Sequence, residues 1–343
     1  MSRITLKEVA IAAKVSVASV SNVLNGSRVH KVSPETAEHI RRVADELGYA
    51  RNHNAAALKQ GYSNMIWLLM SGLAESDQES LLSQQHPFFL DFLSGIEKGT
   101  SVCQLQFGSL RANQARDLAP LLNGPKPQGV ITLGLLNPEV EEVVAKWDLP
   151  TLLVDQEDFF ERYPANPHLC NYGIDDHQMG ELALEHLLGL GHRNIVLLFG
   201  DLALSAVHRA RFEGIKQRAN RFPEPVKLTL IESVTSLGGV ATVFEALCHE
   251  LRAGASAVLA MSDIQAIGVY RMAQRAQLCI PQDFSLIGMD NLSLLDYLPY
   301  RLTTVSQSIV HRGYFAVQQL AKRGAMNPVQ LALVEGETTA ARR

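Results

Sequence analysis

The sequence predicts an all-α head within residues 1–60 and, after it, an α/β body of two doubly wound lobes. Apolar residues in the head recur with the helical period, whereas beyond residue 64 short apolar runs alternate with amphipathic stretches. The charge changes at the same place: residues 1–60 hold nine Lys or Arg against five Asp or Glu, and residues 61–343 hold 22 against 30. A basic head on an acidic body indicates that the head meets a polyanion.

Length and composition narrow the class of protein. A chain of 343 residues, 47% of them hydrophobic, is long enough for two or three domains. Its apolar runs are shorter than the ~18 residues of a membrane span, and the start MSRITLKEVA lacks the apolar core of a signal peptide, so we expect a cytoplasmic protein without membrane contact. Cysteines at 103, 170, 248 and 279 match neither a zinc site nor a CxxC pair, which indicates reduced thiols, no metal and no cofactor.

Three short helices are predicted in the head. The first covers about 6–13, with an apolar stripe at the helical spacing. Ser16 is a good N-cap for a second helix over about 17–24. Ser33-Pro34-Glu35 opens a third helix, which Gly48 ends. The predicted inward residues are Leu6, Val9, Ala10 and Ala13 in the first helix, Val20, Val23 and Leu24 in the second, and Ile40, Val43, Ala44 and Leu47 in the third.

Two short helices joined by a tight turn and braced by a third form a helix-turn-helix, and its second helix has small polar residues on its outer face. A recognition helix places its N-terminal residues against base edges in the major groove, and short side chains let it lie close. Asn22 would pair with an adenine edge and Val17 and Ala18 would touch thymine methyls, while Ser16, Ser19 and Ser21 would donate to phosphates or bases. The alternative is a three-helix bundle that has a polar face and no DNA partner.

The body shows at least six strand–helix units, which predict parallel sheets covered on both faces. Candidate strands cover 65–70, 129–134, 151–155, 194–199, 256–261 and 284–288, and candidate helices cover 88–99, 178–190, 206–219, 239–252 and 264–277. Ligands bind such sheets at the carboxyl ends of the strands, here in a cleft between two lobes.

The sequence shows no catalytic constellation: GxSxG, the P-loop and a GxGxxG after the first strand are all missing. His186 and His192 flank a helix end, where packing is a better explanation than a metal. Asp175 and Asp176 are an acid pair in sequence, but adjacent side chains on an extended chain point apart. We therefore expect a binding protein rather than an enzyme.

The head resembles a known family. TLKEVAIAAKVSVASVSNVLNG is similar to the DNA-binding head of the lactose-repressor (LacI/GalR) family, and the likeness continues through VSPETAEHIRRVADELGYARNHNAAAL. The resemblance implies a DNA-binding domain over 1–50 and a hinge over 51–62 that becomes a helix on operator DNA, where Leu58 would enter the minor groove and Asn52 and Ala55 would flank it. The DNA-binding residues it implies are Thr5, Ser16, Val17, Ala18, Ser19, Ser21, Asn22, Asn25, Tyr49, Asn52, Ala55 and Leu58.

The head departs from the family pattern at three positions. Lys14 stands where the family has its turn glycine, so we expect a left-handed backbone there at a cost of roughly 1 kcal/mol. Asn22 replaces an arginine, which changes the expected base preference. Arg51 replaces a proline, which adds a charge near the phosphates.

The body shares the resemblance. The stretches YGIDDHQMGELALEHLLGLGHRNIVLLFG, RARFEGI, IPQDFSLIGMDN and LTTVSQ follow in family order, and HPFF at 86–89 matches the family's NPFF. The resemblance implies a periplasmic-binding-protein-like core over 63–343, with one lobe at about 63–172 and 306–331 and the other at about 173–305 and 332–343. The effector-binding residues it implies are Ser71, Phe88, Phe89, Asp155, Arg211, Ser262 and Asp290. Val234 stands where many members carry an aromatic residue, and the loop at 75–85 is extra.

These features together predict a ligand-responsive transcriptional regulator, a repressor of carbohydrate genes that binds a palindromic operator. A sugar or phosphosugar suits carboxylates, an arginine fork and an aromatic wall. LVEGETTAARR lacks the leucine heptads of a tetramer, so we expect a homodimer. The alternatives are a nucleobase or nucleoside corepressor in the same architecture, a sugar-binding receptor without DNA function, and an enzyme of the two-lobed class.

Overall fold

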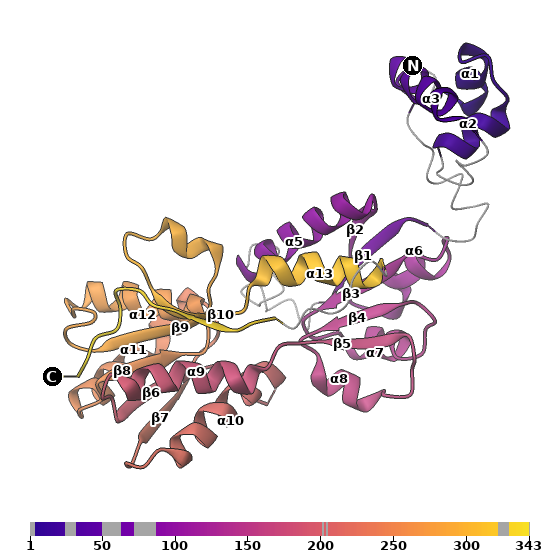
Figure 1. Ribbon diagram of the computed structural model, residues 1–343. Coiled ribbons are helices and arrows are strands. Elements are labelled where there is room, and N and C mark those ends of the chain that lie inside the picture. The colour runs from indigo at the N-terminus through magenta and orange to yellow at the C-terminus, as the bar shows by residue number, and fades with distance from the viewer. Residues whose placement is uncertain are drawn as a thin grey trace. The chain divides into compact units, whose positions relative to one another are not determined.

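The computed structural model describes residues 4–24, 32–49, 63–71, 87–200, 202–203, 205–321 and 329–342. The chain forms two compact units, Met1–Ser63 and Asn64–Arg343, each described here by itself (Figure 1). Within the described residues, no helix has the length and apolar character needed to cross a membrane.

The first unit is a bundle of three helices, α1 (Leu6–Ala12), α2 (Val17–Leu24) and α3 (Pro34–Glu46). Thr5 closes a capping box with Glu8 at the start of α1, and the Ser33 side chain accepts from the Thr36 amide at the start of α3. Their apolar stripes meet in one core, made of Val9, Ala10, Ala13, Val20, Val23, Ala37, Ile40, Val43 and Ala44. Leu47, predicted to face inward, is 38% exposed because α3 has ended there, so that expectation was wrong.

The first lobe of the second unit has a five-stranded parallel sheet in the order β2-β1-β3-β4-β5. Its strands are β1 (Met65–Met70), β2 (Gln106–Arg111), β3 (Gly129–Leu133), β4 (Thr151–Val154) and β5 (Leu169–Tyr172). Its helices are α5 (Pro87–Cys103), η2 (Ala115–Leu118), α6 (Ala119–Leu122), α7 (Pro138–Val144) and α8 (Glu157–Arg162). Apolar clusters cover both faces of the sheet, as in a doubly wound fold.

The second lobe has a six-stranded sheet in the order β11-β10-β9-β8-β6-β7. Its strands are β6 (Asn194–Phe199), β7 (Lys227–Glu232), β8 (Ala257–Ala260), β9 (Ser285–Asp290), β10 (Thr303–Ser306) and β11 (Ala332–Val334). Its helices are α9 (Asp176–Gly189), α10 (Ala206–Arg221), α11 (Leu237–Arg252), α12 (Asp263–Arg275) and η3 (Ser293–Tyr297). Pairing is parallel except between β10 and β11, which are antiparallel. The predicted parallel sheets are confirmed, and the antiparallel edge strand β11 was not among the predicted strands.

The chain passes between the lobes again near its end. After β10 in the second sheet, helix α13 (Ile309–Leu320) packs against α5 of the first lobe, and the chain then returns to add β11 beside β10 (Figure 1). The segment after β10 therefore places α13 side chains next to the carboxyl ends of strands in both sheets.

Candidate functional site

The outer face of α2 carries the small residues that the sequence predicts to read DNA. Val20 and Val23 are buried, whereas Ser16, Val17 and Ala18 are exposed, and Val17 keeps 45% of its surface. The Ser16 hydroxyl accepts from the Ser19 amide at 3.0 Å and caps the helix, while Ser19, Ser21 and Asn22 are half-buried. The N-terminal turn of α2 is thus an accessible surface without long side chains.

The turn before α2 has the strained residue that the sequence predicts. Lys14 adopts φ 54°, in the left-handed region, and its amide donates to the Ile11 carbonyl oxygen at 3.2 Å. The Val15 amide then donates to the Ala10 carbonyl oxygen at 3.1 Å, which closes the end of α1. The expectation of a left-handed lysine is therefore confirmed.

The remaining predicted DNA contacts are spread over the head and beyond it. The Thr5 hydroxyl and amide both donate to the Glu8 carboxylate, at 2.8 and 2.7 Å, and Thr5 stays exposed. Tyr49 is half-buried against the head core. Asn25, Asn52, Ala55 and Leu58 lie outside the described residues.

Arg211, on the first turns of α10, lies at the centre of the polar groups in the body. It is 3% exposed, and each of its three nitrogens donates to a protein oxygen: Nε to Asp176 at 2.8 Å, Nη1 to the Met261 carbonyl at 2.6 Å and Nη2 to Asp290 at 3.1 Å. Burial raises the pKa of Asp176 to about 7, against the opposing effect of the Arg211 charge. Asp176, considered from the sequence only as one of an acid pair, is thus a partner of the predicted effector arginine.

Asp290 connects Arg211 to the first lobe. Its Oδ1 also accepts from the Gln307 amide at 2.6 Å, and the Gln307 oxygen accepts from Arg312 on α13. Arg312 donates in turn to Asp155 at the end of β4. We call Asp155, Asp176, Arg211, Asp290, Gln307 and Arg312 the inter-lobe network, because an unbroken series of hydrogen bonds joins strand ends of both sheets.

Both strand-end carboxylates of this network sit on unusual backbone. Asp155 has φ 54° and Asp290 has φ 115°, conformations that L-residues rarely adopt. Such conformations cost of order 1–3 kcal/mol and persist where surrounding contacts over-determine them. Here the contacts that hold them are the bonds to Arg312 and Arg211.

The other predicted effector residues lie in more ordinary surroundings. The Ser71 hydroxyl accepts from the Asn137 amide at 2.9 Å, and the Ser262 hydroxyl caps α12 by accepting from the Gln265 amide at 3.2 Å. Phe89 is buried in the first-lobe core, and Phe88 is half-buried and stacks on Phe92 at 6.4 Å between ring centroids. The structure therefore brings Asp155, Arg211 and Asp290 into one hydrogen-bonded network. Ser71, Ser262, Phe88 and Phe89 have other neighbours.

Sequence reasoning missed Arg312 and Gln307. A usable signal was present, because Arg312 interrupts the apolar stripe of α13, whose other buried positions are Ile309, Gly313, Ala316, Val317 and Leu320. An arginine on the buried face of a helix needs a partner charge.

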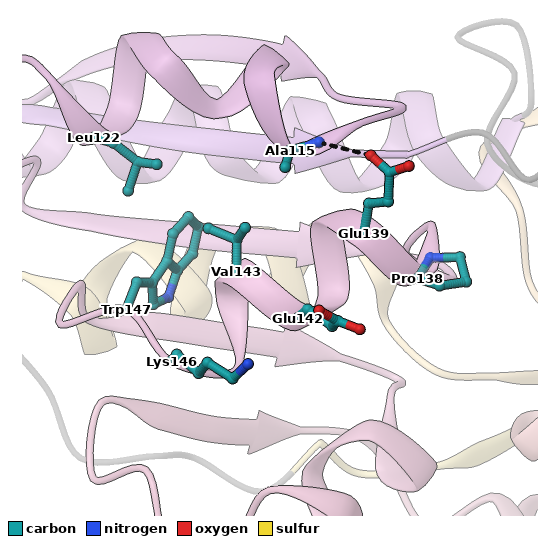
Figure 2. Close-up of a pocket in the computed structure, with 8 residues that line it drawn as sticks. All are labelled: Ala115, Leu122, Pro138, Glu139, Glu142, Val143, Lys146 and Trp147. Carbon is teal, nitrogen blue, oxygen red and sulfur yellow. Dashed lines mark hydrogen bonds between the residues drawn. The ribbon is translucent and has the colours of Figure 1, made fainter.

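Two hollows lie on the second unit. One, of about 540 Å³, lies between η2, α6 and α7, with Leu122, Val143 and Trp147 on its walls (Figure 2). None of the predicted effector residues lines it. The other, of about 410 Å³, lies between α8, the start of α9 and α10, and Asp176 lines it. Within the part of the chain that the structure describes, no group of three or more His, Cys, Asp and Glu is placed to hold a metal ion.

A helix-turn-helix unit joined to a two-lobed body defines the class: a DNA-binding transcriptional regulator with an effector-binding body. Comparison with known families agrees. Residues 5–52 match the model of the bacterial regulatory proteins of the lacI family, and residues 184–340 match the periplasmic binding protein-like domain.

Curated relatives match along nearly the whole chain. The ribose operon repressor of Haemophilus influenzae is 30% identical over 335 residues, covering 93% of this chain and 91% of that one. The transcriptional repressor PurR of Vibrio atlanticus is 28% identical, with 93% and 91% covered. This chain therefore belongs to the lacI family of bacterial regulatory proteins, whose members are transcriptional regulators.

Solved structures show the same fold. The lac repressor dimer bound to operator and the anti-inducer ONPF aligns with a TM-score of 0.73 at 24% identity, over 99% of this chain and all of that one. A LacI family transcriptional regulator from Enterococcus faecium with bound ribose aligns at 0.65 and 25% identity, over 81% of this chain and all of that one. The predicted family and the predicted fold, a helix-turn-helix head on a periplasmic-binding-protein-like core, are both confirmed.

Proposed function

We propose that the protein is a homodimeric repressor that binds a palindromic operator and responds to a small effector. The observation that carries this proposal is the exposed N-terminal face of α2, with Ser16, Val17 and Ala18 presented on a head that matches the family from residue 5 to 52. In a dimer, two such heads read two half-sites related by the protein's two-fold axis.

The domain roles follow from this proposal. Residues 1–50 bind DNA, residues 51–62 act as the hinge, and residues 63–343 bind the effector and form the dimer. The effector closes or shifts the cleft, which moves the N-terminal lobes of the two protomers relative to each other and biases the hinge between helix and coil. A coupling of only ~1–3 kcal/mol is enough to change operator occupancy. We place the protein in the cytoplasm, where its operator lies, and assign it no catalytic turnover.

A sugar or phosphosugar is the effector class we propose. Arg211 and Asp290 supply a guanidinium and a carboxylate side by side, and such groups donate to and accept from vicinal hydroxyls. Two relatives support the assignment by their names, the ribose operon repressor and the ribose-bound regulator from Enterococcus faecium. A nucleobase or nucleoside corepressor is the second candidate, because ring nitrogens and exocyclic groups can also accept from a guanidinium and donate to a carboxylate.

The test is selection of bound duplexes from a random DNA pool, with the full chain at ~150 mM salt so that non-specific phosphate binding is weak. An enriched palindrome with a flexible central step is the expected result. Failure to enrich any sequence, with and without a metabolite extract, would overturn the proposed function.

A leucine variant tests the hinge. Leu58→Ala should weaken binding to the selected palindrome by at least tenfold and leave binding to random DNA nearly unchanged, because an apolar wedge acts only where a base step unstacks. Leu47→Ala is the control, since Leu47 is a 38%-exposed leucine at the end of α3. Equal losses on both DNAs in Leu58→Ala would refute the wedge, and fluorescence anisotropy with labelled duplexes measures both.

A further inference from the structure

We propose that Arg312 is an effector-binding residue, and that the effector it binds is an uncharged, hydroxyl-rich molecule rather than a phosphorylated one. The proposal rests on the proposed function and narrows its ligand class. Three features carry it: an unpartnered donor atom, the position of that atom in the fold, and the balance of buried charge.

The first feature is the Nε atom of Arg312. The side chain is 0% exposed, and its two terminal nitrogens donate to Gln307 and Asp155. Among the residues that the structure describes, none is a hydrogen-bond partner of the buried Nε. A buried donor on a charged group that makes no bond is costly, so this position favours an incoming oxygen acceptor.

The second feature is position. Arg312 contacts Asp155 at the carboxyl end of β4, and through Gln307 it reaches Asp290 at the carboxyl end of β9. Ligands of open parallel sheets bind outside these strand ends. Gln307 bonds to both Asp290 and Arg312. A ligand that contacts Asp290 and Arg211 is therefore separated from Arg312 by one side chain, that of Gln307.

The third feature is charge. The inter-lobe network holds three carboxylates, from Asp155, Asp176 and Asp290, against two guanidiniums, from Arg211 and Arg312. Fully ionised it carries one surplus negative charge, and one bound proton brings it to neutrality. Both guanidiniums are already neutralised by carboxylates, so a phosphate dianion would enter without a compensating cation.

The hollow that borders the network at Asp176 has the same sign. Asp176 lines the hollow between α8, α9 and α10, and six of the eleven residues that line it are Asp or Glu. Arg209, on the same wall, is already paired with Asp158. Carboxylates around this hollow repel an anion that comes near the network, whereas they do not repel a neutral polyol.

The test uses the full chain and a panel of matched pairs: free pentoses, hexoses and disaccharides, each beside its phosphate ester. The shift of thermal unfolding finds the ligand, and calorimetry then gives its Kd. The expected result is that an uncharged member stabilises the protein and its ester binds at least about tenfold more weakly. Tighter binding of an ester, or no stabilisation by any uncharged member, would overturn the proposed ligand class.

Deoxy analogues of the sugar found in this way test Arg312. Arg312→Lys keeps the positive charge but removes Nε and the planar fork. In the wild type, the deoxy analogue that lacks the hydroxyl bound by Nε should bind about tenfold more weakly than the parent sugar. In Arg312→Lys, the same deoxy analogue and the parent sugar should bind with equal affinity. A purely structural arginine would leave the ratio of the two affinities unchanged, and that result would refute its contact with the ligand.

Two measurements keep the interpretations separate. Arg193→Lys is the matched control, because Arg193 is a partly buried arginine of the second lobe that pairs with Glu224 away from the network, and it should leave both affinities as in the wild type. Sugar binding is measured without DNA. Failure of operator selection would therefore count against the proposed function, and not against the ligand class.

Discussion

Three of the residues with positive φ lie at or just before side chains of the DNA-binding face and of the inter-lobe network. Lys14 turns the chain into α2, while Asp155 and Asp290 follow β4 and β9 and hold the two arginines of the inter-lobe network. The aspartates are held by buried ion pairs. Lys14 is exposed, and the backbone hydrogen bonds of the turn offset its strain.

Lys14→Gly should therefore stabilise the head by about 1 kcal/mol, because glycine adopts φ 54° without the Cβ clash. Hydrogen exchange of the buried Val20 and Val23 amides reports the stability of the head within the full chain. Gln104→Gly is the control, since Gln104 has φ 56° in the body and should slow exchange there but not in the head. Unchanged or faster exchange at Val20 in Lys14→Gly would contradict the argument.

His208 is a second residue whose state is set by burial. Its Nδ1 accepts from the Gly200 amide at 2.7 Å, which requires a neutral ring, and burial lowers its pKa from 6.5 to about 3. Between these values the unfolded chain binds the proton and the folded chain does not. The stability that His208 contributes is therefore complete above pH 6.5 and falls as the pH drops toward 3.

His208→Asn should remove this pH dependence, because an amide oxygen replaces Nδ1 as acceptor and does not titrate. The difference in free energy of unfolding between wild type and variant should fall by about 4 kcal/mol from pH 7 to pH 3, measured by urea unfolding. Asp176, whose raised pKa has the opposite sign, acts equally in both proteins and cancels in the difference. His249→Asn removes a 75%-exposed ring, and a comparable difference for that control would contradict the assignment to His208.

At the scale of elements, two pairs of glycines place the helices that carry the arginines. A Cβ on Gly214 of α10 would collide with the His177 carbonyl oxygen, and one on Gly180 of α9 with the Arg211 carbonyl oxygen. Gly95 of α5 and Gly313 of α13 make the same kind of close contact, next to Arg312. Each arginine thus lies on a helix whose backbone touches its neighbour, which fixes the position of the guanidinium.

Gly214→Ala should destabilise the body by about 2–3 kcal/mol, because its methyl group meets backbone that cannot rotate away. It should also weaken effector binding by displacing Arg211 from Asp176 and Asp290. Gly189→Ala on α9 is the control, since no atom of the described part of the chain lies within 4 Å of its Cβ, and it should be neutral or stabilising. Urea unfolding measures both, and equal stability of the two variants would refute the close-contact argument.

The elements that the sequence predicted share a strong pattern, and those it missed do not. The candidate strands at 65–70, 129–134 and 194–199 are continuous apolar runs of central positions, and each is a strand in the structure. The edge strands β2 and β7 are half-exposed, and β10 is short and rich in threonine. Their pairing comes from neighbours distant in sequence, which local periodicity does not register.

The site was predictable only in part for a related reason. Arg211 and Asp290 stand in motifs that the family resemblance identifies, and they do meet in the fold. The bond from Arg211 to Asp176 and the link from Asp290 to Arg312 through Gln307 depend on how α9 and α13 pack. The sequence places Arg312 on a buried helical face, but the carboxylate that pairs with it lies 157 residues away.

At the scale of the body, a second contact also joins the two lobes. Asp91 of α5, which is 6% exposed, accepts from the amide of Ser293 at 2.8 Å and from its hydroxyl group. Apolar side chains of the first lobe and of the segment around Leu292 and Leu295 pack into the same cluster beside it. The lobes are thus held together by this contact as well as by the inter-lobe network.

Asp91→Ala should therefore shift the lobes toward a more separated arrangement, because it removes two hydrogen bonds to a buried carboxylate and leaves the Ser293 donors unpaired. Hydrogen bonds to charged groups contribute about 1.5–3 kcal/mol each, enough to change the population of the lobe arrangement that contains this contact by tenfold or more. We expect a larger radius of gyration in small-angle X-ray scattering and a weaker apparent affinity for effector, since closure then consumes part of the binding energy.

Ser293→Ala removes only the hydroxyl bond and should give a smaller change in the same direction. If Asp91→Ala scatters like the wild type while its stability falls, the contact stabilises the fold without setting the lobe arrangement, and the inter-lobe network alone holds the lobes.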